Sequence, residues 1–324
     1  LLLQKNNCLF IMKKIILKLF RSLSKIILPI LFKIFIKLKL NRRVINFLSE
    51  RGYNSNEKYN FNKLIENLLN NQKMTALDVG AQGGFNSDNF FPKKYNHFFE
   101  NILVEPIREE SDKFKDNKFV INKGLWSQKE KKKLYILDNR LGSTSMYIPD
   151  DKAFDLHDIN NKDFENYKVT RTIEIECDTI SSQLSDLNIN FLDYLKIDTQ
   201  GAELEILKGI GSYRPLLIKI EAHFFSMYKN VPSWHELVNY LYDMNYILID
   251  WKGIGKHSTR IPAEADLIFI PNFNIETGKE LIKDNNKKFI SLMLIFGQLK
   301  LLQVILKRLQ IVNDEIDKLE DRYF

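Results

Sequence analysis

Acidic side chains stand where three short apolar runs of this 324-residue sequence end. Asp78 is the next-to-last residue of the run TALDV, Glu105 follows ILV, and Asp198 follows YLKI. If the runs are parallel strands, their carboxyl ends lie along one edge of a sheet, where such sheets bind ligands. Carboxylates repel a phosphate and attract a cation. The pattern therefore predicts a crevice for a ligand that carries positive charge.

A glycine-rich loop, GAQGG at 80–84, directly follows the first of these runs. Glycines allow a tight turn and a close approach of a ligand to the backbone. Glu105 lies about twenty residues beyond, where a carboxylate can accept hydrogen bonds from both ribose hydroxyls of an adenosine. The loop is neither GxGxxG nor a Walker A loop. We expect it to bind a nucleoside, although an ordinary strand-to-helix turn would need no ligand.

Two kinds of adenosine cofactor would suit this loop and Glu105. A nicotinamide dinucleotide would place its pyrophosphate on the glycines next to Asp78, which is electrostatically unfavourable. S-adenosyl-L-methionine carries a sulfonium and an ammonium and no phosphate, and it matches the acids Asp78, Glu105 and Asp198. The pattern therefore favours S-adenosyl-L-methionine, with an NAD-linked oxidoreductase as the disfavoured alternative.

A further set of candidate residues follows the apolar run Leu216–Ile220. Methyl transfer from a sulfonium is an in-line displacement, and a hydroxyl acceptor must also lose its proton. An imidazole accepts a proton near neutral pH, so His223 is the preferred base, with Glu221 and Asp198 as alternatives. A capping or core role for His223, and a purely helix-stabilising role for Glu203, stay open. The candidate catalytic residues are Asp198, Glu203, Glu221 and His223.

Apolar runs and helical patterns alternate through the middle of the chain, which is typical of a parallel sheet covered on both faces. Helical patterns lie at 202–209 and 234–244. The expected strands are Thr75–Val79, Ile102–Val104, Phe119–Ile121, Thr172–Glu176, Leu192–Ile197, Leu216–Ile220, Tyr246–Ile249 and Asp266–Ile270.

Residues 126–171 interrupt this alternation, and we expect an insertion of hairpins and loops there. The insertion could form a lid over the acceptor. Its polar residues Ser143, Thr144, Ser145 and Tyr147 could hydrogen-bond a sugar, and Trp126 could stack on an adenine or a sugar ring. A plain surface loop would have the same composition.

The chain resembles the FkbM-type family of S-adenosylmethionine-dependent methyltransferases from about residue 74 to residue 251. The resemblance rests on DVGAQGG at 78–84, VEP at 104–106, GLWS at 124–127, LKIDTQGAELEILKG at 195–209 and IKIEAHF at 218–224. It implies an α/β fold, a Rossmann-like class I methyltransferase sheet of seven mostly parallel strands, with helical N- and C-terminal extensions. It also implies O-methylation of sugars, glycolipids or polyketide-type products.

The resemblance also implies roles for individual residues, with two departures. Gln200 stands where the family often has an acid, and Gln82 stands where it often has the asparagine of GAN. Asp198 and Glu203 would border the methyl-transfer site. The residues expected to hold the cofactor are Asp78, Gly80, Ala81, Gln82, Gly83, Gly84, Glu105, Pro106, Leu125 and Trp126.

The N-terminal segment 1–50 is strongly basic, since residues 1–51 carry a net charge of +11. Within residues 9–40, charged residues recur at helical spacing among Ile, Leu and Phe, and Pro29 should interrupt the helix. No uncharged run there approaches the roughly 20 residues that span a bilayer. We expect peripheral membrane contact through this segment, or an amphipathic helix packed on the domain. Residues 1–11 precede the first methionine, Met12, and need not be native.

The C-terminal segment 272–324 is expected to be a helical extension of a methyltransferase domain at 51–271. Its polar part, 272–288, is typical of a linker with one helix. Apolar residues then recur at spacings of three and four through 302–319, which predicts packing on the same chain or a homodimer. The residues of this stripe are Leu302, Ile305, Leu309, Val312, Ile316 and Leu319.

Charge and cysteine content exclude several classes of protein. Residues 52–324 carry a net charge of −4, so a nucleic-acid partner is not expected. Two cysteines without CxxC, and five histidines without HxH or HExxH, give no metal site and no disulfide framework. We expect a cytoplasmic protein, with the inner face of the membrane as the place of any membrane contact. Its acceptor would be a glycan, glycolipid or other hydroxyl-bearing molecule, and a catalytically silent methyltransferase-like binding module is the alternative.

Overall fold

The computed structural model describes residues 60–87, 91–154, 164–252, 263–317 and 319. The chain divides between Gly52 and Tyr53, and all described residues belong to the second unit. The segments 1–50 and 9–40, to which the sequence assigns membrane contact, lie outside the described residues. Among the helices that are described, none is both long and apolar enough to cross a membrane.

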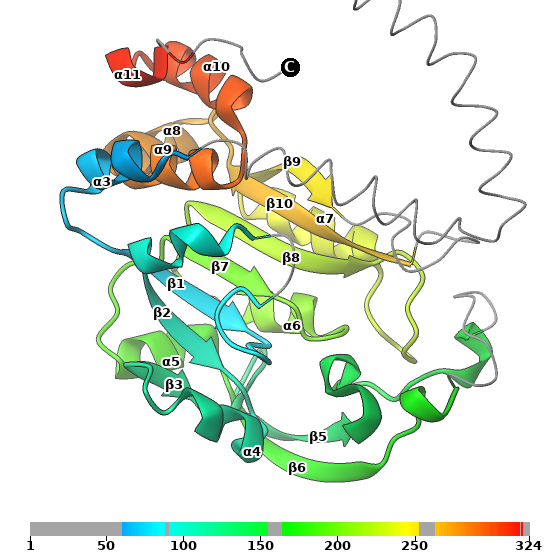
Figure 1. Ribbon diagram of the computed structural model, residues 1–324. Helices are drawn as coiled ribbons and strands as arrows, with labels where there is room; N and C mark the ends of the chain where they lie inside the picture. Colours follow the sequence, from blue (N-terminus) through cyan, green and yellow to red (C-terminus); the bar gives the residue numbers. More distant parts are fainter. Residues whose placement is uncertain (1–59, 88–90, 155–163, 253–262, 318, 320–324) are drawn as a thin grey trace, which may run out of the picture. The chain divides into compact units, whose positions relative to one another are not determined.

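A seven-stranded sheet forms the centre of the described unit, in the order β3-β2-β1-β7-β8-β10-β9 (Figure 1). β10 pairs antiparallel with β8 and β9, and the neighbouring pairs among β3, β2, β1, β7 and β8 are all parallel. The predicted Rossmann-like, mostly parallel sheet is therefore confirmed. The strands are β1 (Met74–Val79), β2 (Phe99–Val104), β3 (Phe119–Ile121), β7 (Tyr194–Ile197), β8 (Leu217–His223), β9 (Tyr246–Lys252) and β10 (Glu264–Pro271).

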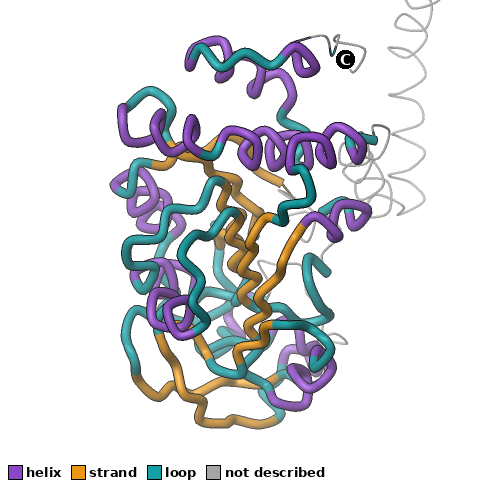
Figure 2. Tube along the Cα trace, turned by 90° about the vertical axis from the view of Figure 1, so that its left-hand side faces the viewer, coloured by secondary structure: helices purple, strands orange, loops and turns teal. Residues whose placement is uncertain are grey.

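Helices cover both faces of this sheet, which explains why its central strands are apolar on both sides. On one face, Met74 and Ala76 of β1 share a core with α3 (Asn62–Leu69), α9 (Asn286–Ile295) and α10 (Leu299–Leu309). On the other face, Leu77 and Val79 pack with the second core. Its helices are α5 (Ile180–Asp186), α6 (Glu203–Lys208) and α7 (Trp234–Asp243). The strands of the main sheet thus lie between layers of helices (Figure 2).

The C-terminal segment completes one of these layers. Residues 272–288 contain the predicted helix, α8 (Glu276–Asp284), and the start of α9, but the segment packs in the helix layer and is not a linker. The many polar residues of this segment indicated a linker, but they face outward, while Gly278 and Ile282 are buried. Of the apolar stripe at 302–319, four members are buried on this chain's own core, whereas Val312 is 83% exposed. A homodimer through this stripe stays a prediction.

A second sheet of three strands, in the order β4-β6-β5, lies apart from the main one (Figure 1). It contains β4 (Gly124–Leu125), β5 (Glu130–Ile136) and β6 (Arg171–Asp178). The sequence placed Thr172–Glu176 in the main alternation, and the structure corrects this. β6 pairs antiparallel with β5, the one strand inside the described part of the insertion. The exposed sides of both strands carry Lys and Glu, as in a sheet with one face in water.

Short elements connect these layers. The described part of the insertion consists of strand β5, short 3-10 helices and loops, because polar residues and turn formers give it few buried apolar positions. The remaining elements are η2 (Lys93–Phe98), α4 (Arg108–Ser111), η3 (Asp112–Phe114), η4 (Asp138–Ser143), η5 (Asp151–Ala153), η6 (Phe164–Tyr167) and α11 (Asp314–Asp317).

Candidate active site

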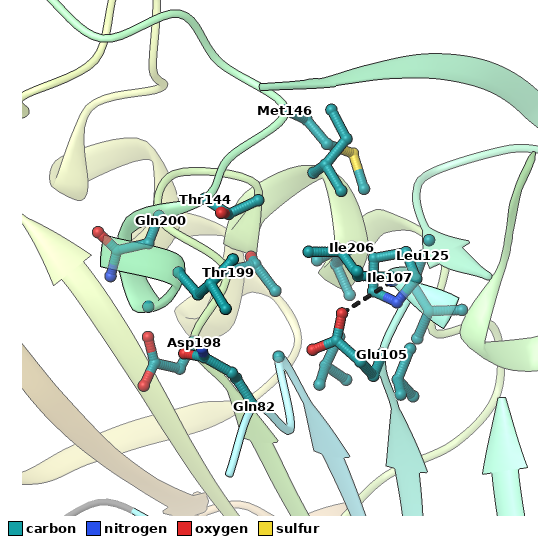
Figure 3. Close-up of a pocket in the computed structure, with 18 of the residues that line it drawn as sticks. Gln82, Glu105, Ile107, Leu125, Thr144, Met146, Asp198, Thr199, Gln200 and Ile206 are labelled. Atoms are coloured by element: carbon teal, nitrogen blue, oxygen red, sulfur yellow. Dashed lines mark hydrogen bonds between the residues drawn. The ribbon is translucent and has the colours of Figure 1, made fainter. Parts of the chain in front are cut away.

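A cavity of about 200 Å³ lies at the carboxyl ends of β1, β2 and β7. Figure 3 shows Glu105 on one side of it and Asp198, Thr199 and Gln200 on the other. This is the crevice in which open α/β sheets bind ligands. Six of the residues proposed from the sequence as cofactor-binding or catalytic line it: Gly80, Gln82, Glu105, Pro106, Leu125 and Asp198.

Gly80 joins the ends of β1 and β7 at the floor of this cavity. Its φ is +82°, and a Cβ built on it would lie 1.9 Å from the backbone oxygen of Asp198. The amides of Gly80 and Ala81 both donate to the carbonyl of Val104, at the end of β2. Only glycine fits a position that has a positive φ and a backbone oxygen where the side chain would begin. The loop thus holds the ends of three strands together.

Glu105 presents a carboxylate to the cavity from the end of β2. It is 5% exposed, and its Oε1 accepts a hydrogen bond of 2.9 Å from the amide of Ile107. Burial raises its pKa to about 7, an effect that the Ile107 hydrogen bond opposes. No residue in the described part of the chain donates to Oε2. One oxygen is therefore fixed, and the other is available to a ligand hydroxyl.

Asp78 does not line the cavity, in contrast to the expectation that three acids would share it. Its side chain is fully buried, with Oδ1 2.9 Å from Lys196 Nζ and Oδ2 accepting a 2.8 Å bond from the amide of Asn86. Asp78 lies two residues beyond Ala76 in β1, so its side chain points to the same face of the sheet, toward the core that contains the C-terminal helices. Its charge is compensated inside the protein.

Four other residues expected at the cofactor do not line the cavity. Ala81 is buried against Leu103 and Phe114, and Gly83 and Gly84 turn the loop with positive φ angles. Trp126 is buried, with the ammonium of Lys132 4.1 Å from the centre of its ring. These residues shape the loop and its surroundings rather than the cavity wall.

Glu203, Glu221 and His223 form a buried cluster, in which each offers a ligand atom within 4.8 Å of the others. The cluster joins the start of α6 to the end of β8. None of the three lines the cavity, but the two glutamates bond to residues that do. Glu203 Oε1 accepts from the amide and the hydroxyl of Thr199, and Glu221 Oε2 accepts a 2.6 Å bond from Gln200. The cluster therefore lies directly behind the loop Asp198–Gln200.

Negative charge is concentrated around this cluster. Burial raises the pKa of Glu221 well above its ordinary value, and the charges of Asp198, Glu264, Glu203 and Asp266 raise it further. Burial also raises the pKa of Glu264, while His223 lowers it. Such an arrangement of acids favours a cation or a shared proton.

The insertion contributes to the site mainly as a support. Thr144 lines the cavity, whereas the Ser145 hydroxyl donates a 2.7 Å bond to the carbonyl of Gln200. Tyr228, which the sequence did not single out, places its hydroxyl 2.8 Å from the carbonyl of Ser143 and 3.0 Å from Gln200 Oε1. Tyr147 is half-buried, and burial raises its pKa to about 12. These contacts fix Gln200, whose φ is +60°.

Comparison with protein families matches residues 78–248 to the family described as methyltransferase FkbM domain. The match covers more than half of the chain. The chain belongs to this family. A comparison with curated proteins gives no match.

The FkbM domain begins at Asp78, and its matched region ends at Leu248 in β9, so it contains both the cavity and the buried cluster. It leaves out β10, the antiparallel strand between β8 and β9, and the C-terminal helices that cover one face of the sheet. The methyltransferase sheet of this chain is thus completed by residues beyond the matched region.

Besides Tyr228, two further contributors to the site were not predicted from the sequence. Lys196 was counted as part of an apolar strand, although a charged residue in the run YLKI signals a buried partner. Gln200 was noted only as a departure from the family pattern, yet it links Glu221, Tyr228 and the cavity. A glutamine between a strand and a glycine gives no such signal in the sequence.

Proposed function

We propose that this FkbM methyltransferase uses S-adenosyl-L-methionine and transfers the methyl group to a hydroxyl of a sugar, on a glycan or glycolipid. The observation that carries the cofactor assignment is the pairing of Glu105 with the Gly80 turn at one cavity. The free oxygen of Glu105 suits a ribose hydroxyl, and the glycine lets the ligand approach the backbone. Leu125, Ile107 and Ile206 offer an apolar wall for the adenine (Figure 3).

The charges at the cavity support a sulfonium cofactor over a phosphate-bearing one. Glu105 and Asp198 line it, and the ammonium of Lys196 is 2.9 Å from Asp78 and 3.7 Å from Asp198. A pyrophosphate would have to lie between two acids, which is unfavourable. A sulfonium and an ammonium are attracted to them. This balance disfavours an NAD-linked oxidoreductase.

A hydroxyl acceptor needs alignment with the S–CH₃ bond and a group that takes its proton. As the oxygen bonds to the methyl carbon, the electrons of the S–C bond pass to sulfur, and the product is neutral S-adenosylhomocysteine. Of the four candidate catalytic residues, Asp198 is the one that lines the cavity. We therefore assign the proton to Asp198, with His223, Glu221 and Glu203 supporting the loop behind it. Gln82, Thr144 and Thr199 add polar groups to the wall for a sugar.

Binding and turnover test this function separately. Isothermal titration calorimetry with S-adenosylhomocysteine should show one site per chain, and NAD should not bind. Transfer of a labelled methyl group from S-adenosyl-L-methionine to a glycan and lipid extract should depend on Asp198. If S-adenosylhomocysteine binds but no methyl group is transferred to any glycan or lipid, the alternative of a silent binding module is favoured. Failure to bind S-adenosylhomocysteine would refute the cofactor assignment.

A further inference from the structure

His223 brings an unusual feature to the buried cluster of Glu203, Glu221 and His223. The residue is 6% exposed, and its Nε2 has no hydrogen-bond partner in the described structure. That atom lies 3.4 Å from Glu221 Oε2 and points into the cluster. A buried ring nitrogen without a partner costs free energy and therefore requires an explanation. A metal ion is one ligand that such a nitrogen commonly binds.

The two carboxylates leave oxygens for the same ligand. Glu203 Oε1 accepts hydrogen bonds from Thr199 and from the amide of Gly201, and no described residue donates to its Oε2. Glu221 Oε2 accepts from Gln200, and its Oε1 receives no hydrogen bond from the described residues. The bonds to Oε1 of Glu203 orient its carboxylate, as outer-shell contacts do for metal ligands.

The nearby cations are already engaged with other acids. Lys196 lies between Asp78 and Asp198, and Lys219 Nζ is 3.3 Å from Asp266 Oδ2. Among the described residues, neither Glu203 nor Glu221 forms an ion pair with a lysine or arginine, and the partner of Glu221 is His223. A neutral imidazole and two carboxylates would gain from a divalent cation between them.

We propose that Glu203, Glu221 and His223 form a binding site for a divalent first-row metal ion. One imidazole nitrogen and two carboxylate oxygens suit Mn²⁺, Fe²⁺ or Zn²⁺ better than they suit Ca²⁺, which prefers an all-oxygen set. The sequence shows no metal-binding motif because the three ligands come from two separate elements, α6 and β8. The tertiary structure brings them together.

The role of the ion in catalysis rests on the proposed function, whereas its binding does not. The loop Asp198–Gln200 lies between the cluster and the cavity and contacts both. An ion held by the cluster would fix the two glutamates that bond to Thr199 and Gln200. It would thereby position Asp198 at the cavity rather than bind the acceptor.

Metal binding is tested on the full-length protein after removal of metals with a chelator. MnCl₂ is added, and electron paramagnetic resonance reports the free ion. We expect one Mn²⁺ per chain, displaced by ZnCl₂. His223→Ala and Glu221→Gln should each weaken binding at least about tenfold, since even outer-shell changes have such effects. Glu205→Gln is the matched control, because Glu205 lies on the same helix but pairs with Ser127 and Lys208.

Absence of Mn²⁺ and Zn²⁺ binding in the wild type, or unchanged binding in both cluster variants, would overturn the proposal and favour a His223–Glu221 ion pair. Circular dichroism and thermal melting show whether the variants are folded. If one of the variants is not folded, Glu203→Gln replaces it. The titration of the wild type tests metal binding without any variant. S-adenosylhomocysteine calorimetry on the metal-free protein separates the two proposals. Metal binding without cofactor binding refutes only the function, and the reverse refutes only the metal site.

Discussion

The ammonium of Lys196 lies 2.9 Å from the carboxylate of Asp78, and both side chains are buried. The two residues stand on neighbouring parallel strands, β7 and β1, at paired positions of the register. The same ammonium is 3.7 Å from Asp198, which lines the cavity. A buried ion pair therefore anchors the strand ends from which the site is built.

Replacement of Lys196 by methionine should destabilise the protein strongly. Asp78 would remain buried without its cation, and breaking a buried pair in this way costs about 3–5 kcal/mol. Urea unfolding followed by circular dichroism measures the free energy of unfolding. Lys131→Met is the control, because Lys131 and Glu174 form an ion pair in which both side chains are 60% exposed. We expect nearly unchanged stability there, and an equal loss in the two variants would argue against a structural role for Lys196.

Glu105→Gln should weaken the binding of S-adenosylhomocysteine by about 10- to 100-fold. The ribose hydroxyls would lose charge-assisted hydrogen bonds, whose strength this range reflects. Calorimetry at pH 8 measures the change. Glu205→Gln changes the same side chain outside the cavity and should leave the affinity as it is. Equal affinity in Glu105→Gln and wild type would remove Glu105 from the cofactor site.

The pH dependence of binding should report the same carboxylate. The pKa of Glu105 is raised to about 7 by burial, so the ligand-free protein holds it partly protonated at neutral pH. Since the ionised form accepts the ribose hydroxyls, affinity should fall as the pH decreases from 8 to 6. Glu105→Gln should remove this dependence. A wild-type affinity that is constant over this range would contradict the assignment.

The raised pKa of Glu105 also makes the stability of the ligand-free protein depend on pH, but stability should fall as the pH rises, whereas affinity should increase. An acid whose pKa is raised in the folded state costs stability as the pH rises from about 4.5 to about 7. Glu105→Gln should therefore stabilise the ligand-free protein at pH 8, by up to about 3 kcal/mol. Thermal melting at pH 5 and pH 8 measures it. A variant less stable than wild type at both values would show that the carboxylate supports the fold instead.

Asp198→Asn should abolish most methyl transfer while leaving S-adenosylhomocysteine binding within about tenfold. Loss of a positioned base lowers rates by roughly 10²- to 10⁴-fold. Single-turnover transfer of a labelled methyl group gives the rate, and calorimetry gives the affinity. If the rate persists, the proton must go to another group, and His223, the base preferred from the sequence, becomes the next candidate.

Gly80→Ala should destabilise the protein and disturb the cavity. A Cβ at this position meets the backbone oxygen of Asp198 at 1.9 Å, and a φ of +82° costs an L-residue about 1–2 kcal/mol by itself. Gly142→Ala is the matched control, because the nearest atom to its Cβ is the end of the flexible Gln82 side chain, at 3.1 Å. Urea unfolding should show a clearly larger loss for Gly80→Ala. Similar losses would mean that the loop can adjust.

Much of the fold and part of the site follow from local sequence patterns. Apolar runs that alternate with helical patterns identify the seven strands of the main sheet, and an acid after such a run locates its carboxyl end. For this reason Glu105 and Asp198 were placed correctly at one cavity. Thr172–Glu176 was assigned to the wrong sheet because its apolar alternation is the same in either sheet, and only pairing with β5 separates the two.

What the tertiary structure decided is which charged groups meet. The sequence offered Asp78 as a cavity acid, but Lys196 from another strand lies against it and neutralises its charge inside the core. It offered Glu203, Glu221 and His223 as separate candidates, and the packing of α6 against β8 makes them one cluster. Strand and helix patterns depend on neighbours along the chain, whereas electrostatic partners depend on distances in space between residues that are far apart in sequence.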